Sequence, residues 1–146
     1  MQSKTSDGNI TLLRGRGRLE ASTSDGDIHI ADFDGPISAQ TSDGNIKAAE
    51  VKDRLRAQTS DGDIIALFAG KKVDESQLRT SDGNIQMEID KEAQLSLDFK
   101  VSDGNINSDI SITGKFQRNH LRGDYNGGGA KLRASTSDGD ITIHTK

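Results

Sequence analysis

Thr5-Ser6-Asp7-Gly8-Asn9-Ile10 is the stretch that decides the fold, because close copies of it return along the whole chain. Its centre, Ser-Asp-Gly followed by Asn or Asp and then Ile, begins again at six later serines: Ser24, Ser42, Ser60, Ser81, Ser102 and Ser137. The first three intervals are 18 residues, the next two are 21 and the last is 35. A constant unit with insertions between fixed corners is typical of repeat architectures.

Apolar and polar residues alternate on both sides of each Ser-Asp-Gly corner. Ile28 and Ile30 follow one corner at alternate positions, and Leu19/Ala21/Thr23 precede it with the same period. A period of two predicts half-buried strands, at least two in each unit. The second corner of each unit, for example Lys52-Asp53-Arg54, is less regular and is the expected place for insertions.

Two all-β folds fit this pattern. Asp-Gly between alternating strands is a hairpin signal, so an antiparallel β-meander is the alternative. In a parallel β-solenoid of about seven coils, each 18- to 21-residue unit forms one coil, and residue i stacks on residue i+18 about 4.8 Å away. Only stacking explains why the same letters return, so the sequence predicts the solenoid, with Ile28 lying between Ile10 and Ile46 in parallel register.

Length and composition limit the classes of function. The 146 residues are enough for a single domain covering 1–146, and aromatic residues make up 3%, so the core must consist mainly of small aliphatic side chains. The net charge of -4 gives no overall attraction to nucleic acid, which is not an expected partner. There is no cysteine, so disulfides and thiolate metal sites are excluded. No run approaches the roughly 20 apolar residues of a membrane helix.

The repeat resembles a bacterial family of adhesin-like proteins of unknown function. The resemblance rests on the recurring Thr-Ser-Asp-Gly-Asn/Asp-Ile units and on the closing segments Gly123–Gly129 and Leu132–Ile141, and it covers essentially the whole chain. It implies a right-handed β-solenoid located in the cell envelope or outside the cell, with no catalytic residues to carry over. The chain opens in the middle of a unit, so we expect it to be part of a longer protein with further domains.

The aspartates of the corners form one column in a stacked solenoid: Asp7, Asp25, Asp43, Asp61, Asp82, Asp103 and Asp138. Carboxylates about 4.8 Å apart repel each other by about 0.9 kcal/mol at the dielectric constant of water. We expect each Asp to bind the backbone N–H groups of its own turn. The alternative is a calcium-stabilised β-roll, with Asp25, Asp43 and Asp61 as the candidate ligands. The Gly-Gly-x-Gly-x-Asp motif of calcium β-rolls is absent, so no metal or other cofactor is predicted.

The glycines of the corners are predicted to be structural: Gly8, Gly26, Gly44, Gly62, Gly83, Gly104 and Gly139. We expect them to have positive φ, which would make Gly44→Val more damaging than a change of Asp43. The next position alternates between Asn and Asp, and no two successive units both place Asp there. This alternation prevents a second charged ladder.

The threonines that precede the corners also form a column. Thr23 and its equivalents are in phase with Leu and Ala, and Val101 replaces Thr in one unit. This phase predicts inward-facing side chains with hydroxyls bonded to the backbone, instead of the flat threonine array of an ice-binding surface.

No constellation of residues identifies a reaction. His29, His120 and His144 occupy unrelated positions, and the acidic residues repeat with the fold, as structural residues do. Tyr125 is the one aromatic side chain expected outside the core that could support a sugar. Several basic residues could gather near one corner of adjacent coils, where we expect them to form a solvent-exposed edge: Arg14, Arg16, Arg18, Lys52, Arg54 and Arg56.

The sequence therefore predicts a non-enzymatic structural or adhesin-like module that displays a surface or spaces other domains. A cell-surface protein or a polysaccharide is the expected partner, and a carbohydrate-binding or carbohydrate-processing β-helix is the alternative. The segment Gly114–Lys131 is long enough to cover the carboxyl-terminal end, with Phe116 and Leu121 as anchors. The other end is expected to stay open and to associate with a second copy through Met1–Thr11.

Overall fold

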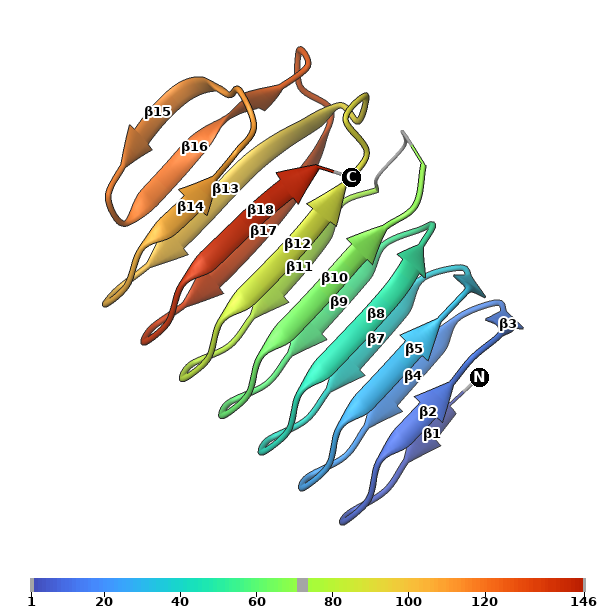
Figure 1. Cartoon of the computed structure of the whole chain (residues 1–146). Coiled ribbons are helices and arrows are strands. Elements are labelled where there is room, and N and C mark those ends of the chain that lie inside the picture. The colour runs from blue at the N-terminus through green and yellow to red at the C-terminus, as the bar shows by residue number, and fades with distance from the viewer. Residues whose placement is uncertain (1, 71–73, 146) are drawn as a thin grey trace.

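The computed structural model describes residues 2–70 and 74–145, and strands are the regular elements of these residues. The strands form two facing sheets that run the length of a stack of coils, with the amino terminus at one end (Figure 1). The strong alternation of apolar and polar residues explains this arrangement, because each strand buries one face between the sheets and exposes the other.

The larger sheet has nine strands. In spatial order they are β1 (Gln2–Lys4), β4 (Leu19–Ser22), β7 (Ile37–Gln40), β9 (Leu55–Gln58), β11 (Ser76–Arg79), β17 (Ala130–Thr136), β13 (Leu95–Val101), β16 (His120–Tyr125) and β15 (Thr113–Gln117).

The second sheet has seven strands. In spatial order they are β14 (Ile106–Ser108), β18 (Ile141–Thr145), β12 (Ile85–Ile89), β10 (Ile64–Phe68), β8 (Ile46–Val51), β5 (Ile28–Ala31) and β2 (Ile10–Leu12). A short pair, β3 (Gly15–Arg16) and β6 (Phe33–Asp34), forms a small third sheet at the second corner of the first two coils.

The repeats stack in parallel register, as the sequence predicts. Ile28 pairs with Ile10 on one side and with Ile46 on the other. The column of isoleucines continues through Ile64 and Ile85, and the buried members are at most 7% exposed. This pairing confirms the β-solenoid and excludes the antiparallel meander for the repeated coils.

The order of the coils in space differs from their order in the chain. Strands β17 and β18 lie between the coil of β11 and β12 and the coil of β13 and β14 (Figure 1). Ile141 pairs with Ile85 on one side and with Ile106 on the other. The last coil of the sequence is therefore an inserted coil, and residues 141–144 do not form an end of the stack.

A hairpin closes one edge at the far end. Strands β15 and β16 pair antiparallel, and β16 also pairs antiparallel with β13. Leu121 is completely buried there, whereas the Phe116 side chain is 57% exposed. The excursion thus covers this end with Leu121 as an anchor and without Phe116. At the other end, β1 pairs with β4 and β2 pairs with β5, and the self-association expected there stays a prediction.

The link into the inserted coil is held by side chains. The Tyr125 hydroxyl donates to the Lys91 carbonyl oxygen at 2.8 Å, and the Asn126 Nδ2 donates to the carbonyl oxygens of Lys91 and Ala93 at 3.0 and 2.8 Å. Tyr125 is only 7% exposed, so the expectation that it offers a platform for sugars is wrong. Its ring supports the turn that returns the chain between two earlier coils.

Candidate functional site

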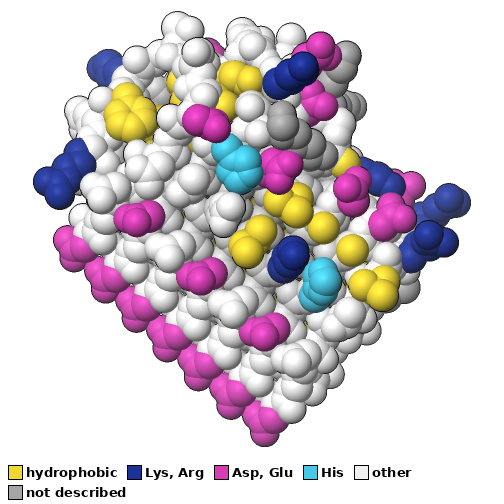
Figure 2. All heavy atoms as spheres, in the orientation of Figure 1, with side chains coloured by type: hydrophobic (Ala, Val, Ile, Leu, Met, Phe, Trp, Pro, Cys, Tyr) yellow, Lys and Arg dark blue, Asp and Glu magenta, His cyan; other side chains and the backbone are white. Residues whose placement is uncertain are grey.

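An unbroken line of acidic side chains follows the edge formed by the Ser-Asp-Gly turns (Figure 2). The corner aspartates on this edge are all exposed. The carboxyl groups of Asp43 and Asp61 lie close enough to interact, as do those of Asp82 and Asp138, so the stacking brings acidic groups together across coils. Among the described residues, no three His, Cys, Asp or Glu side chains form a group that could hold a metal ion, and this includes Asp25, Asp43 and Asp61.

The pKa values of two members of this acidic edge are raised. For Asp43 the main cause is the hydrogen bond with Asp61, followed by burial and by the neighbouring Asp25. For Asp82 the main cause is the hydrogen bond with Asp138, which belongs to the inserted coil. The acidic neighbours disfavour the charged form of each of these carboxyl groups, so the raised pKa values reflect repulsion between coils along the edge.

The corner glycines are required by close packing and not by their φ angles. The positive-φ glycines of the chain lie elsewhere, so the expected left-handed conformation at the corners is wrong. A Cβ at Gly44 would overlap the carbonyl oxygen of Gly26, and a Cβ at Gly62 would overlap that of Gly44. Gly8, on the first coil, would have its nearest contact at 3.5 Å, with the Thr5 hydroxyl.

The threonine hydroxyls bind the corner of the neighbouring coil. The Thr41 Oγ1 donates to the Gly26 carbonyl oxygen at 3.0 Å, and the Thr59 Oγ1 donates to that of Gly44 at 2.9 Å. Both side chains are 3% exposed. The inward orientation predicted for this column is confirmed, and these threonines cannot form a flat exposed array.

The Asn and Asp residues after the corner glycines form a second ladder. The Asp27 Oδ1 accepts the backbone N–H of Asn45 at 2.8 Å, and the Asn45 Oδ1 accepts that of Asp63 at 2.8 Å. The inserted coil continues the ladder, because Asp140 lies between Asn84 and Asn105. In space, the column therefore alternates strictly between Asn and Asp from Asn9 to Asn105.

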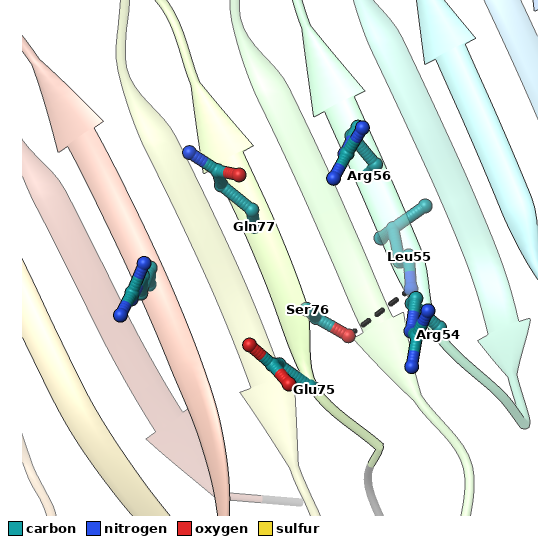
Figure 3. Close-up of a pocket in the computed structure, with 7 residues that line it drawn as sticks. Arg54, Leu55, Arg56, Glu75, Ser76 and Gln77 are labelled. Atoms are coloured by element: carbon teal, nitrogen blue, oxygen red, sulfur yellow. Dashed lines mark hydrogen bonds between the residues drawn. The ribbon is translucent and has the colours of Figure 1, made fainter.

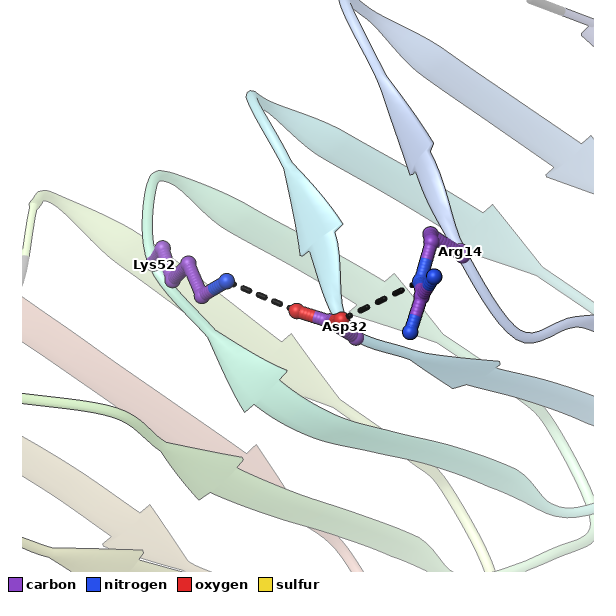
Figure 4. Close-up of polar contacts among 3 residues, drawn as sticks. All are labelled: Arg14, Asp32 and Lys52. Atoms are coloured by element: carbon purple, nitrogen blue, oxygen red, sulfur yellow. Dashed lines mark hydrogen bonds and ion pairs between the residues drawn. The ribbon is translucent and has the colours of Figure 1, made fainter.

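An ion-paired group ties together the second corners of the first three coils. The Asp32 carboxylate lies 2.7 Å from the Lys52 Nζ and 3.7 Å from the Arg14 Nε (Figure 4). The hydrogen bond from Lys52 lowers the pKa of Asp32 and raises the pKa of Lys52. Asp32 has a φ of 53°, a left-handed conformation that Asp tolerates. Arg14 and Lys52 therefore stabilise the fold locally.

A hollow lies on the outer face of the nine-stranded sheet, over β9, β11 and β17. It encloses about 140 Å³ and is lined by Arg54, Leu55, Arg56, Glu75, Ser76, Gln77 and Arg133. Figure 3 shows Arg54 and Arg56 on one side of this hollow, with Glu75 and Gln77 facing them from the other. Arg79 follows on β11 two residues after Gln77, on the same face. We call Arg54, Arg56, Arg79 and Arg133 the arginine face.

The core column is irregular at Ser76, which lines this hollow. Ser76 pairs with Leu132 and occupies the position that leucine or isoleucine fills in neighbouring coils. The Leu55 backbone N–H donates to the Ser76 Oγ at 3.1 Å, and that hydroxyl donates to the Asp74 carbonyl oxygen at 3.0 Å. A serine hydroxyl thus replaces a backbone carbonyl as the acceptor at the beginning of the ladder between β9 and β11.

A second hollow of about 220 Å³ adjoins the first. It is lined by Arg18, Leu19, Glu20, Pro36, Ile37, Ser38, Arg54 and Arg56. Arg54 and Arg56 line both hollows, which therefore adjoin each other, and we refer to the two hollows together as the groove. The sequence predicts that the basic residues could gather near one corner, and the structure divides them. Arg18, Arg54 and Arg56 lie together at this hollow, whereas Arg14 lies with Lys52 at Asp32.

The three histidines lie apart from this groove. The Nε2 of His120 lies 3.2 Å from the Asp98 Oδ1, and that of His144 lies 3.7 Å from the Glu88 Oε2. His29 lies on β5 of the other sheet. No two of these histidines share a partner, so the described residues offer no histidine-based centre.

Comparison with known families identifies the family of the chain. The family model described as Toastrack DUF4097 matches residues 1–144. Neither a curated protein nor a solved structure shows significant similarity to the chain. Within the described residues, no helix is long and apolar enough to cross a membrane.

Proposed function

Because the chain belongs to the Toastrack DUF4097 family, we propose that it is a non-catalytic module of a bacterial envelope-associated or secreted protein. As a β-solenoid of unknown function, it would display a surface for adhesion and space the domains attached to it. A cell-surface polymer is the partner that fits such a role.

The observation that carries this proposal is that the repeated polar side chains serve the neighbouring coils. The Thr hydroxyls bind corner carbonyls, and the Asn and Asp side chains bind backbone N–H groups one coil away. Among the described residues, every buried side-chain nitrogen or oxygen has a hydrogen-bond partner. A catalytic site needs convergent groups with altered reactivity, whereas here the recurring groups hold the stack together.

A module that spaces domains should tolerate a change in length by whole coils. We would insert a second copy of residues 24–41 after Thr41 and label single cysteines placed at Leu13 and Lys115, since the chain has no cysteine of its own. Spectroscopic distances between the labels should grow by about 4.8 Å with the extra coil. Beads coated with either protein should adhere equally to isolated envelope material.

A parallel screen for hydrolase, lyase and esterase activity between pH 5 and pH 8 tests the non-catalytic part of the proposal. Turnover that a single point substitution abolishes would overturn it. Loss of adhesion on insertion of one coil, with the fold intact by circular dichroism, would instead show that a unique site and not a modular surface mediates adhesion.

A further inference from the structure

The arginine face carries positive charge without internal partners. Arg54, Arg56 and Arg133 are exposed and line one hollow, and none of them forms an ion pair with another described residue. Glu75 is the acidic residue that lines the same hollow. Asp98, on the nearby strand β13, is engaged elsewhere, because its Oδ1 lies 3.2 Å from the His120 Nε2. At the second corner, by contrast, Asp32 forms ion pairs with both Arg14 and Lys52.

The spacing of these cations follows from the register. Gln77 pairs with Arg56 on β9 and with Arg133 on β17, so the two arginines stand in one row with an amide between them. Neighbouring strands are about 4.8 Å apart, which places the two arginine Cα atoms about 10 Å apart. A guanidinium binds a carboxylate with two parallel hydrogen bonds, and such pairs are stronger than neutral hydrogen bonds.

The shape of the groove favours an extended ligand. Its two hollows of about 140 and 220 Å³ are each smaller than the roughly 300 Å³ at which small-molecule pockets begin. They adjoin across several strands and share Arg54 and Arg56. A chain lying across the strands could contact both hollows, whereas a compact molecule could fill only one.

The neutral side chains of the groove favour a hydroxyl-rich polymer. Ser38 and Gln77 line the two hollows beside the arginines and can donate to or accept from sugar hydroxyls. No aromatic side chain lines either hollow, so bases of a nucleic acid would have nothing to stack on.

From these observations we propose that the arginine face binds an anionic polysaccharide, with Arg56 and Arg133 each holding a carboxylate of the glycan and Gln77 a hydroxyl group between them. This rests on the proposed function, because it names the class of polymer that the displayed surface takes.

Polygalacturonate is the probe, and its fully methyl-esterified form is the matched neutral polymer. Calorimetry on the whole chain at about 50 mM salt should show saturable binding of the acid form, which weakens as salt is raised, and no binding of the ester. Arg56→Gln/Arg133→Gln should lower the affinity by about tenfold or more, because two charge-assisted contacts are lost. Arg56→Lys/Arg133→Lys should show a smaller loss, since charge remains without the paired geometry.

Lys115→Gln/Arg118→Gln is the control, because it removes the same charge from exposed positions at the β15 hairpin. It should bind like the wild type, and circular dichroism should show that all variants are folded. Equal affinity of the Arg56→Gln/Arg133→Gln and wild-type proteins would overturn the proposal. So would equal binding of the ester, or tighter binding of polyphosphate or single-stranded DNA of matched length.

The chain length of the polymer after incubation with the protein tests the ligand class and the non-catalytic function separately. Unchanged polymer that binds through Arg56 and Arg133 supports both. Shortened polymer whose cleavage depends on the same two arginines would support the ligand class and overturn the non-catalytic function. No binding by the wild type would overturn the ligand class and leave the modular role to the coil-insertion experiment.

Discussion

At the scale of the residue, the corner glycines were predicted correctly, but for the wrong physical reason. The repeat predicts a glycine in every corner turn, and the structure shows that close packing requires it in every coil after the first. The reason is the carbonyl oxygen of the coil beside it, which leaves no room for a Cβ at Gly44. One sequence cannot show this, because close approach between coils depends on how tightly the turns stack.

Gly44→Ala should therefore destabilise the protein strongly, by about 3 kcal/mol, because the overlap is with backbone that cannot rotate away. Gly127→Ala is the matched control. Gly127 has a φ of 87°, and a Cβ added there would meet no atom within 4 Å. Only the strain of the left-handed conformation should therefore lower the free energy of unfolding, by about 1 kcal/mol. Urea denaturation measures both, and a larger loss for Gly127→Ala would refute the packing explanation.

Ser76 is the residue that sequence reasoning missed. Alignment of Ser76-Gln77-Leu78-Arg79-Thr80 on the Leu-x-Ala-x-Thr pattern places a serine where leucine is expected, which is a detectable signal. The longer spacing of this unit obscures the alignment. The hollow that Ser76 lines is also lined by Arg133 from a distant part of the chain, and this neighbour was not predictable from the spacing.

At the scale of the element, each column behaves as a unit because its members interact across coils. The alternation of Asn and Asp is imperfect along the chain, where Asn84 is followed by Asn105. It becomes perfect in space when Asp140 lies between them. The sequence contained this clue to the inserted coil, but only a rule of strict alternation would have revealed it.

The acidic edge should make stability depend on pH. The folded-state pKa of Asp43 is raised above its usual 3.8, so its favourable contribution is complete below about 3.8 and is lost as pH rises through the raised value. Asp43→Asn removes the carboxylate and therefore the loss of stability that follows its ionisation. The melting temperature of this variant should exceed that of the wild type at pH 7 and low salt. The difference should shrink as pH falls below the raised pKa and as salt is added.

The exposed Asp109 lies outside the corner column, so Asp109→Asn is the control and should not change the pH profile in this way. A melting temperature of Asp43→Asn below that of the wild type at pH 7 would contradict repulsion along the edge. It would show instead that the carboxylate of Asp43 stabilises its own turn, as the sequence first suggests.

At the scale of the whole molecule, the stacking of the first five coils was predictable and the position of the last was not. Identical letters every 18 residues dictate parallel stacking, since each residue then meets its own kind. The same identity makes the coils nearly interchangeable, so only the column of Asn and Asp residues distinguishes the order of the last two. The hydrogen bonds of Asn126 to Lys91 and Ala93, which direct the chain back, have no counterpart in other coils.

The inserted coil should remain bound after the chain is cut beside it. We would place a protease site between Gly127 and Gly128, cleave the folded protein and measure whether the segment from 128 onward stays associated on gel filtration. Leu132, Ile141 and Ile143 are completely buried, and each contributes about 1.5–3 kcal/mol, so we expect roughly micromolar affinity or tighter. Ile141→Asp in the cleaved protein should release the segment.

Immediate separation of the wild-type segment under native conditions would show that β17 and β18 do not lie between two coils. Ile141→Asp is the matched control, because it differs from the wild type only in the buried column. Both proteins must give the same far-ultraviolet circular dichroism before cleavage for the comparison to hold.

The inserted coil also has a consequence during synthesis on the ribosome. When residues 95–108 emerge, the strands that will pair with them, β16, β17 and β18, have not yet been translated, and the edges of β11 and β12 are still free. The nascent chain is expected to stack β13 and β14 on those edges first. Completion of the native topology then requires this early pairing to dissociate when β17 and β18 arrive, so the final step of folding is an exchange between two nearly equivalent partners.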